Sequence, residues 1–137
     1  MPDPYANIVH VDEAIQERFA EILELRASDS QQQKMLTTYL SQIEFPLGDH
    51  ILDVGCGTGA LCRRLSTYPG VSKIVGLDPS PIFIKRAKEL SKDLSNISYE
   101  EGDGRNLPYE NDSFDILLFH TVLCHNEYLN KIKVAPV

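Results

Sequence analysis

The stretch ILDVGCGTGA places Asp53 directly before three closely spaced glycines, Gly55, Gly57 and Gly59. Glycine is costly in backbone entropy, so three in one turn indicate a chain that bends sharply or approaches a ligand closely. The backbone N–H groups of such a turn, where a helix follows, are suited to bind a polar ligand. The sequence therefore predicts a binding loop here, with a tight turn that binds nothing as the alternative.

Further carboxylates accompany other apolar runs of the chain. Asp78 ends the run SKIVGLD, nineteen positions after Gly59, where its carboxylate could accept hydrogen bonds from two ribose hydroxyls. Asp103 follows a third run and could accept a hydrogen bond from an adenine amino group. Together with Asp53 and Asp115, these side chains predict a carboxylate-rich rim along one edge of a sheet.

The charge of this rim separates two nucleotide ligands. Gly55, Gly57 and Ala60 satisfy the G-x-G-x-x-G/A fingerprint of dinucleotide-binding sites. Clustered carboxylates would repel the two phosphates of a dinucleotide, whereas they would attract a ligand with a sulfonium and an ammonium group. The charge therefore favours S-adenosylmethionine, with an NAD(P)-dependent oxidoreductase as the less favoured interpretation.

An alternation of strands and helices must position these residues, and it predicts an α/β fold with a doubly wound, mostly parallel sheet. Ser80 and Pro81 are expected as the N-cap and the first residue of the second helix. Its inward-facing residues are expected to be Phe83, Ala87, Leu90 and Leu94. Strands are expected at 51–54, 72–78, 97–103 and 114–119, and helices at 59–68 and 80–94.

Two amphipathic helices are expected upstream, within residues 11–26 and 29–43. The first has Asp12 as a candidate N-cap. Its expected apolar face consists of Ile15, Phe19, Ile22 and Leu23.

Composition limits the classes of function. The 137 residues suffice for one domain, and 42% apolar content is typical of a folded chain. A net charge of −7 argues against a nucleic-acid partner, and no apolar run is long enough to span a membrane. Three cysteines without the spacing of a disulfide framework favour a reducing, cytoplasmic location.

Residues 51–125 resemble the class I, seven-stranded S-adenosylmethionine-dependent methyltransferases with a Rossmann-like fold. The resemblance is to the small-molecule type related to quinone-biosynthesis methyltransferases. It rests on four stretches in order: ILDVGCGTG, VGLDPS, EGDGRNLPYENDSFD and LLFHTVLCH. It implies methyl transfer from S-adenosylmethionine to a small-molecule acceptor whose identity the sequence does not reveal.

The resemblance also implies a donor site, position by position. The methionine part would be wrapped by Gly55, Cys56, Gly57 and Gly59, with Asp53 orienting the loop or receiving the ammonium. Asp78 would bind the ribose, and Pro79 would pack near the adenine. The adenine edge would meet Asp103 and Gly104, and His120 would lie close to the sulfonium.

Catalytic side chains are less clearly marked. His120 and His125 are weak candidates for a general base, needed only for an acceptor that must lose a proton. With Cys124 they do not complete a zinc site, so no metal is expected. Arg26 is expected to be an exposed arginine at a helix end; the less favoured alternative is that it binds the donor's carboxylate if the first helices cover the crevice.

The chain is expected to comprise a helical lid segment (1–46), a donor-binding domain (47–125) and a divergent tail (126–137). The family's pattern continues with further strands, which the tail does not supply, so we expect missing C-terminal strands and an early terminus. The fourth strand would then be an exposed apolar edge, open to a homodimer or another partner. A truncated, non-catalytic donor-binding or interaction module is the alternative function.

Overall fold

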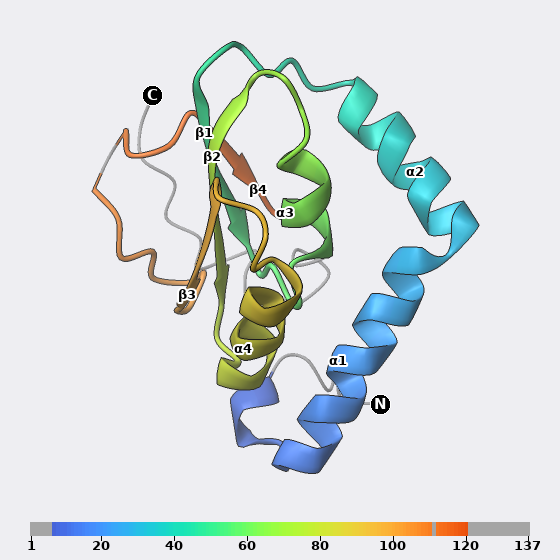
Figure 1. The fold of residues 1–137 in the computed structure, drawn as a ribbon. Helices are drawn as coiled ribbons and strands as arrows, with labels where there is room; N and C mark the ends of the chain where they lie inside the picture. Colours follow the sequence, from blue (N-terminus) through green and yellow to red (C-terminus); the bar gives the residue numbers. More distant parts are fainter. Residues whose placement is uncertain (1–6, 111, 121–137) are drawn as a thin grey trace.

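A computed structural model describes residues 7–110 and 112–120. Its sheet has the strand order β3-β2-β1-β4, and every pairing is parallel (Figure 1). The order reverses beside β1, which is the doubly wound arrangement, so the expected α/β class and parallel sheet are confirmed. The expected tail at 126–137 lies outside the described residues. The strands are β1 (Asp49–Val54), β2 (Val71–Asp78), β3 (Ile97–Glu101) and β4 (Ile116–Leu118).

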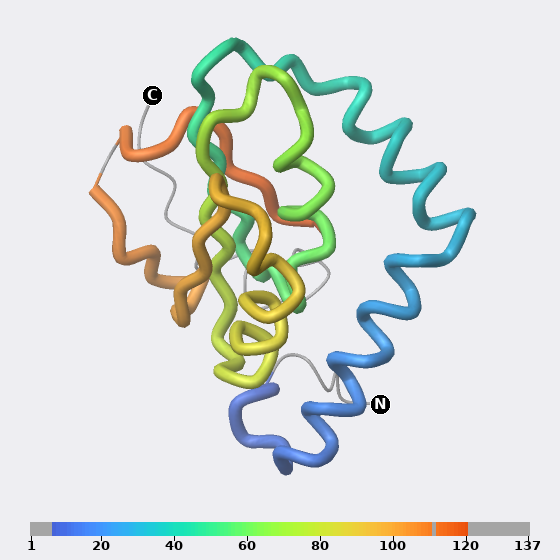
Figure 2. The backbone as a smooth tube through the Cα atoms, viewed as in Figure 1, coloured from blue at the N-terminus to red at the C-terminus, as the bar shows by residue number. Residues whose placement is uncertain are grey.

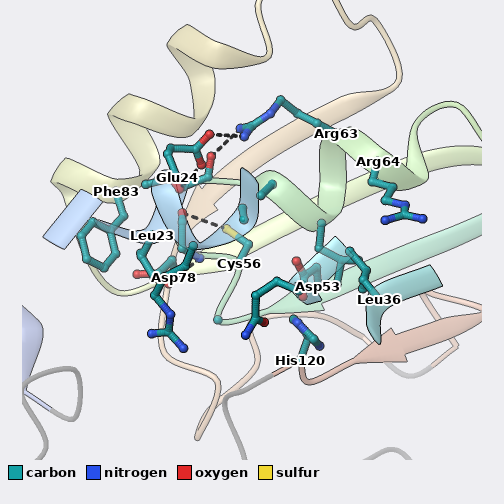
Figure 3. Close-up of a pocket in the computed structure, with 18 of the residues that line it drawn as sticks. Leu23, Glu24, Leu36, Asp53, Cys56, Arg63, Arg64, Asp78, Phe83 and His120 are labelled. Carbon is teal, nitrogen blue, oxygen red and sulfur yellow. Dashed lines mark hydrogen bonds and ion pairs between the residues drawn. The ribbon is translucent and has the colours of Figure 1, made fainter. Parts of the chain in front are cut away.

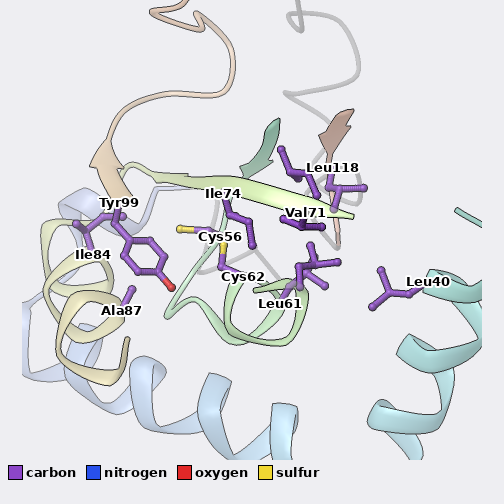
Figure 4. Packing of buried hydrophobic residues seen from close by; sticks show 12 residues of the cluster. Leu40, Cys56, Leu61, Cys62, Val71, Ile74, Ile84, Ala87, Tyr99 and Leu118 are labelled. Atoms are coloured by element: carbon purple, nitrogen blue, oxygen red, sulfur yellow. The ribbon is translucent and has the colours of Figure 1, made fainter. Parts of the chain in front are cut away.

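Two helices, α3 (Ala60–Leu65) and α4 (Pro81–Leu90), cover one face of the sheet. Ser80 caps α4 by accepting a hydrogen bond from the Phe83 N–H, and Pro81 is its first residue, as expected. The expectation that Leu90 faces inward was wrong, because its side chain is 41% exposed. The buried cluster under these helices (Figure 4) includes Ile51, Leu61, Cys62, Leu65, Ile74, Ile84, Ala87 and Tyr99.

The opposite face of the sheet is covered by the connection between β3 and β4, which contains no helix among its described residues. Four buried strand residues form this second cluster: Leu52, Val54, Val75 and Leu77. Leu107, Tyr109 and Phe114 of the connection pack against them. Both faces of β1 and β2 are therefore shielded from water, which explains why the two central strands read as nearly continuous apolar runs.

The N-terminal segment forms a short 3₁₀ turn, η1 (Ile8–His10), and the helices α1 (Glu13–Ser28) and α2 (Ser30–Ser41). Asp12 caps α1, as expected, and Asp29 separates the two helices and caps α2 through the N–H groups of Gln31 and Gln32. In the tube view this segment runs outside α3 and α4 (Figure 2).

The buried face of α1 agrees with the expected one only in part: Phe19 and Leu23 are partly buried and pack against a core cluster. Ile15 and Ile22 are exposed, whereas Gln16 and Ala20 are buried. The reason is that α1 packs against α4, where Ala20 contacts the cluster of Ile8 and Phe83. No helix within the described residues is long and apolar enough to cross a membrane.

Candidate functional site

A cavity of about 690 Å³ lies between the carboxyl ends of the central strands and the N-terminal helices (Figure 3). The strand side contributes Asp53, the loop after β1, Asp78 and His120. The helical side contributes residues of both α1 and α2, including Leu23, Glu24, Arg26, Gln33 and Leu36. The cavity therefore occupies the crevice where open α/β sheets bind their ligands, and the N-terminal helices cover it.

The loop from Gly55 to Gly59 joins β1 to α3 and forms the floor of this cavity. Its glycines Gly55, Gly57 and Gly59 have φ angles of +72°, +56° and +86°, a region that glycine adopts without strain. The N–H groups of Gly55 and Cys56 both donate to the Leu77 carbonyl, at 2.7 and 3.0 Å. These two backbone hydrogen bonds therefore hold the start of the loop against the end of β2.

Asp78 holds the same loop from the end of β2. Its carboxylate accepts hydrogen bonds from the N–H groups of Gly57 and Ser80, each at 2.9 Å. Burial raises the pKa of Asp78 to about 6, although these two bonds oppose the shift. A carboxylate offers about four acceptor positions, so Asp78 keeps capacity for a ligand's hydroxyl groups.

Asp53, at the end of β1, is a buried carboxylate that is only partly satisfied. Its Oδ2 accepts a long contact from the Cys62 thiol at 3.4 Å, and its Oδ1 has no hydrogen-bond partner among the described residues. Burial, reinforced by the charge of Asp78, raises the pKa of Asp53 to about 7. A buried acceptor without a partner is unfavourable, so this oxygen fits a cationic ligand group in the cavity.

His120 follows β4 and lines the cavity next to α2. Its ring lies 5.8 Å from the Tyr39 ring, measured between centroids. Burial lowers the pKa of His120 below its usual value of 6.5, so the imidazole is neutral at pH 7. A neutral imidazole can accept a proton, which is the property that a general base requires.

A family model described as a methyltransferase domain matches residues 51–134. The chain belongs to this methyltransferase domain family. A demethylmenaquinone methyltransferase from Staphylococcus haemolyticus is 36% identical over 77 residues, which are 56% of this chain and 32% of that enzyme. The resemblance to methyltransferases seen in the sequence motifs is thereby confirmed, and quinone methyltransferases are among the relatives that match.

Solved structures place the fold in the same group. The PH0226 protein from Pyrococcus horikoshii has a TM-score of 0.66 at 27% identity, over 77% of this chain and 51% of that one. A further match is phosphoethanolamine N-methyltransferase 1 from Haemonchus contortus, which was solved with phosphoethanolamine and S-adenosylhomocysteine. Its TM-score is 0.61 at 17% identity, over 89% of this chain and 30% of that one. S-adenosylmethionine is the methyl donor of this family. The chain spans between about a fifth and a third of the length of the first curated relatives that it matches.

Within this methyltransferase domain, the structure brings most of the residues expected at the donor site to the cavity. Gly59 does not line it; it is the N-cap of α3, and the Tyr99 hydroxyl fills the space that a Cβ at Gly59 would need. Asp103 and Gly104 also lie outside the lining, and the Asp103 carboxylate pairs with Arg105. His125 lies outside the described residues. The expected residues that line the cavity are Asp53, Gly55, Cys56, Gly57, Asp78, Pro79 and His120.

Two residues of the cavity lining, Glu24 and Arg63, lie outside the sequence motifs. Glu24 on α1 pairs with Arg63 on α3 and accepts a hydrogen bond from the Thr58 hydroxyl. These contacts join positions more than thirty residues apart, so local periodicity cannot reveal them. Across the described ranges, 7–110 and 112–120, no cluster of His, Cys, Asp and Glu is arranged to hold a metal ion.

Proposed function

We propose that this chain is the donor-binding part of an S-adenosylmethionine-dependent methyltransferase with a small-molecule acceptor. The observation that carries the proposal is the carboxylate of Asp53, a residue that lines the cavity and whose buried Oδ1 atom has no hydrogen-bond partner among the described residues. The donor's ammonium would satisfy this atom. The ammonium would also stabilise the carboxylate form of a group whose pKa burial has raised to about 7.

The other donor contacts follow from the arrangement around Asp53. Gly55, Cys56 and Gly57 would follow the methionine part, since the glycines leave room for close approach. Asp78 would accept hydrogen bonds from the ribose while it holds the glycine loop, and Pro79 would flank the adenine. The roles of Asp103 and Gly104 at the adenine edge, and of Gly59 in the loop, carry less weight because these residues do not line the cavity.

Arg26 would take the donor's carboxylate. It lines the cavity from the last turns of α1, and it has no ion pair among the described residues. Arg63, the neighbouring guanidinium, is already paired with Glu24. The carboxylate and the ammonium of the donor would thus meet groups of opposite charge on opposite sides of the cavity, which orients the methionine part.

The chain's residues contribute to methyl transfer chiefly by alignment. S-adenosylmethionine supplies an electrophilic methyl group, and an in-line displacement needs its sulfonium and the acceptor atom held close together while water is excluded. The cover formed by α1 and α2 would limit the access of water to the cavity. His120 would take up a proton from the methyl acceptor, where that acceptor must lose one. The carboxylates of Asp53 and Asp78, which both line the cavity, would favour a cationic donor over dinucleotides.

Calorimetric titration with S-adenosylhomocysteine, which keeps the ammonium and the ribose, tests the proposal. We expect saturable binding by the chain and a loss of about ten- to a hundredfold in affinity for Asp53→Asn, as removal of a buried charged partner commonly produces. Asp49→Asn is the matched control: Asp49 is also buried, also has an oxygen without a partner in the described structure, but lies at the other end of β1, outside the cavity. A folded chain that does not bind the ligand, or binding of reduced nicotinamide dinucleotide instead, would refute the proposal.

A further inference from the structure

Glu24 connects the N-terminal helices to the glycine loop through both of its carboxylate oxygens. Oε2 accepts a hydrogen bond from the Thr58 hydroxyl at 2.5 Å, and Oε1 accepts one from the Arg63 guanidinium (Figure 3). Arg63 also donates to the Thr58 carbonyl at 2.8 Å. The three side chains therefore form a closed network between α1, the glycine loop and α3.

This network is shielded from water on the loop side. Thr58 is only 2% exposed, while the side chains of Glu24 and Arg63 are 24% and 21% exposed. Charge-assisted hydrogen bonds are stronger than neutral ones, and a hydroxyl left buried without its acceptor is unfavourable. Glu24 therefore holds α1 on the loop more firmly than a fully exposed ion pair would.

The two halves of α1 are held in different ways. Its first half is anchored to α4: Ala20 packs into the cluster of Ile8 and Phe83, and the Ser80 hydroxyl donates to the Gln16 side chain at 2.9 Å. After Ala20, no residue of α1 is fully buried. The second half is thus attached to the glycine loop mainly through Glu24 and its neighbour Leu23.

Leu23 extends this contact to the backbone where the donor would lie. A Cβ added at Gly57 would come within 3.2 Å of the Leu23 Cδ1 atom, so the leucine occupies space that the glycine leaves open. The second half of α1 consequently covers the loop directly. A ligand bound along Gly57 would therefore lie next to this covering segment.

We propose that Glu24 is a positioning residue that latches the second half of α1 onto the glycine loop and thereby sets the rate at which the donor and its product exchange. This proposal rests on the proposed function only in naming the ligand that exchanges; the contact between Glu24 and the loop does not depend on it. Loss of the Glu24 charge releases the second half of α1, while the first half stays anchored on α4. The loop becomes more accessible, and both entry and release of the ligand become faster.

Hydrogen exchange without ligand tests the latch itself. In Glu24→Gln we expect amides of α1 after Ala20 to exchange at least fivefold faster, with the amides of β1 and β2 unchanged. Glu21→Gln is the matched control, because Glu21 is an exposed glutamate on the same helix outside the cavity lining. Equal exchange in Glu24→Gln and the wild type would overturn the latch, and faster exchange throughout the sheet would reduce Glu24 to a purely structural role.

Release of S-adenosylhomocysteine from the immobilised chain tests the consequence for exchange. We expect release from Glu24→Gln to be at least fivefold faster than release from Glu21→Gln and from the wild type. The double variant Glu24→Gln, Arg63→Gln should release the ligand no faster than either Glu24→Gln or Arg63→Gln alone. Unchanged or slower release, as would follow if the freed Arg63 bound the ligand's carboxylate, would overturn the gating role. A wild-type chain that does not bind this ligand would refute the proposed function, while the exchange of α1 amides would still decide the latch.

Discussion

The sheet with α3 and α4 and the segment formed by α1 and α2 are held in place by different forces. Each of α3 and α4 buries three residues, mostly apolar, against the strands, whereas α1 buries only Gln16 and Ala20, and α2 buries only Leu40. The N-terminal helices add polar contacts to these few apolar ones: Glu24 to Thr58 and Arg63, and Arg64 to Thr37 and Gln33. Apolar burial fixes the scaffold of the site, while its cover is held by fewer apolar contacts together with polar contacts that water can replace.

Truncation of the buried scaffold should have the largest effect. Leu65 is the last residue of α3, and its side chain is fully buried. Leu65→Ala should therefore lower the free energy of unfolding by about 2–5 kcal/mol, because burial is lost and a cavity is left behind. Leu25→Ala on α1, where the side chain is 71% exposed, should change it by less than about 0.5 kcal/mol. Denaturant unfolding measures both. Similar losses for the two variants would contradict the contrast between scaffold and cover.

The pH dependence of stability should come from the scaffold as well. The pKa of Asp53 rises from 3.8 to about 7 on folding, and that of Asp78 rises to about 6. A raised pKa means that the folded chain binds the proton more tightly, so the stability from these groups is full below pH 4 and is lost as the pH rises through 6 and 7. The ligand-free chain should thus lose on the order of 4 kcal/mol between pH 5 and pH 8, most of it from Asp53.

Unfolding curves across this pH range, compared with Asp53→Asn, check the origin of the trend. The variant cannot ionise at this position, so its stability should vary less with pH than that of the wild type. A wild-type chain that becomes more stable from pH 5 to pH 8 would show that other groups dominate.

The smallest effect should come from the second polar tie of the cover. Thr37 is exposed and accepts a hydrogen bond from the Arg64 guanidinium. Thr37→Val removes the acceptor, and an exposed bond of this kind contributes less than about 1 kcal/mol. Thermal unfolding and α1 exchange should therefore remain close to wild type, in contrast to Glu24→Gln. An effect as large as that of Glu24→Gln would show that both ties hold the cover equally.

The same division explains how far the sequence could predict the structure. The order of strands and helices after residue 48 follows from apolar runs, from glycines and from the Ser80 and Pro81 signals, all of which act locally. The buried face of α1 could be predicted only in part, because it depends on Phe83 of α4 and on the Gln16 contact with Ser80. Periodicity selected Phe19 and Leu23, which pack against the cluster of Phe83, but also Ile15 and Ile22, which are exposed.

The candidate site shows the same limit. Asp53, Gly57 and Asp78 could be placed from motifs, since strand ends gather at one edge of a parallel sheet. Glu24 could not be placed, because its partners are defined only by how α1 lies on the folded domain. The conformation of the connection after β3 could not be predicted either. There the Asp103 carboxylate pairs with Arg105 and does not line the cavity.

Tyr99 lies where its spectroscopic properties can report on the glycine loop. The chain contains no tryptophan, so its tyrosines are its intrinsic fluorophores. The Tyr99 hydroxyl lies 2.8 Å from the Ser91 hydroxyl and 3.5 Å from the Gly59 carbonyl, directly beneath the start of α3. A displacement of the loop changes the hydrogen bonding of this phenol, and with it the emission and near-ultraviolet dichroism of a buried chromophore. Motion at the floor of the cavity can therefore be observed spectroscopically in the unlabelled chain.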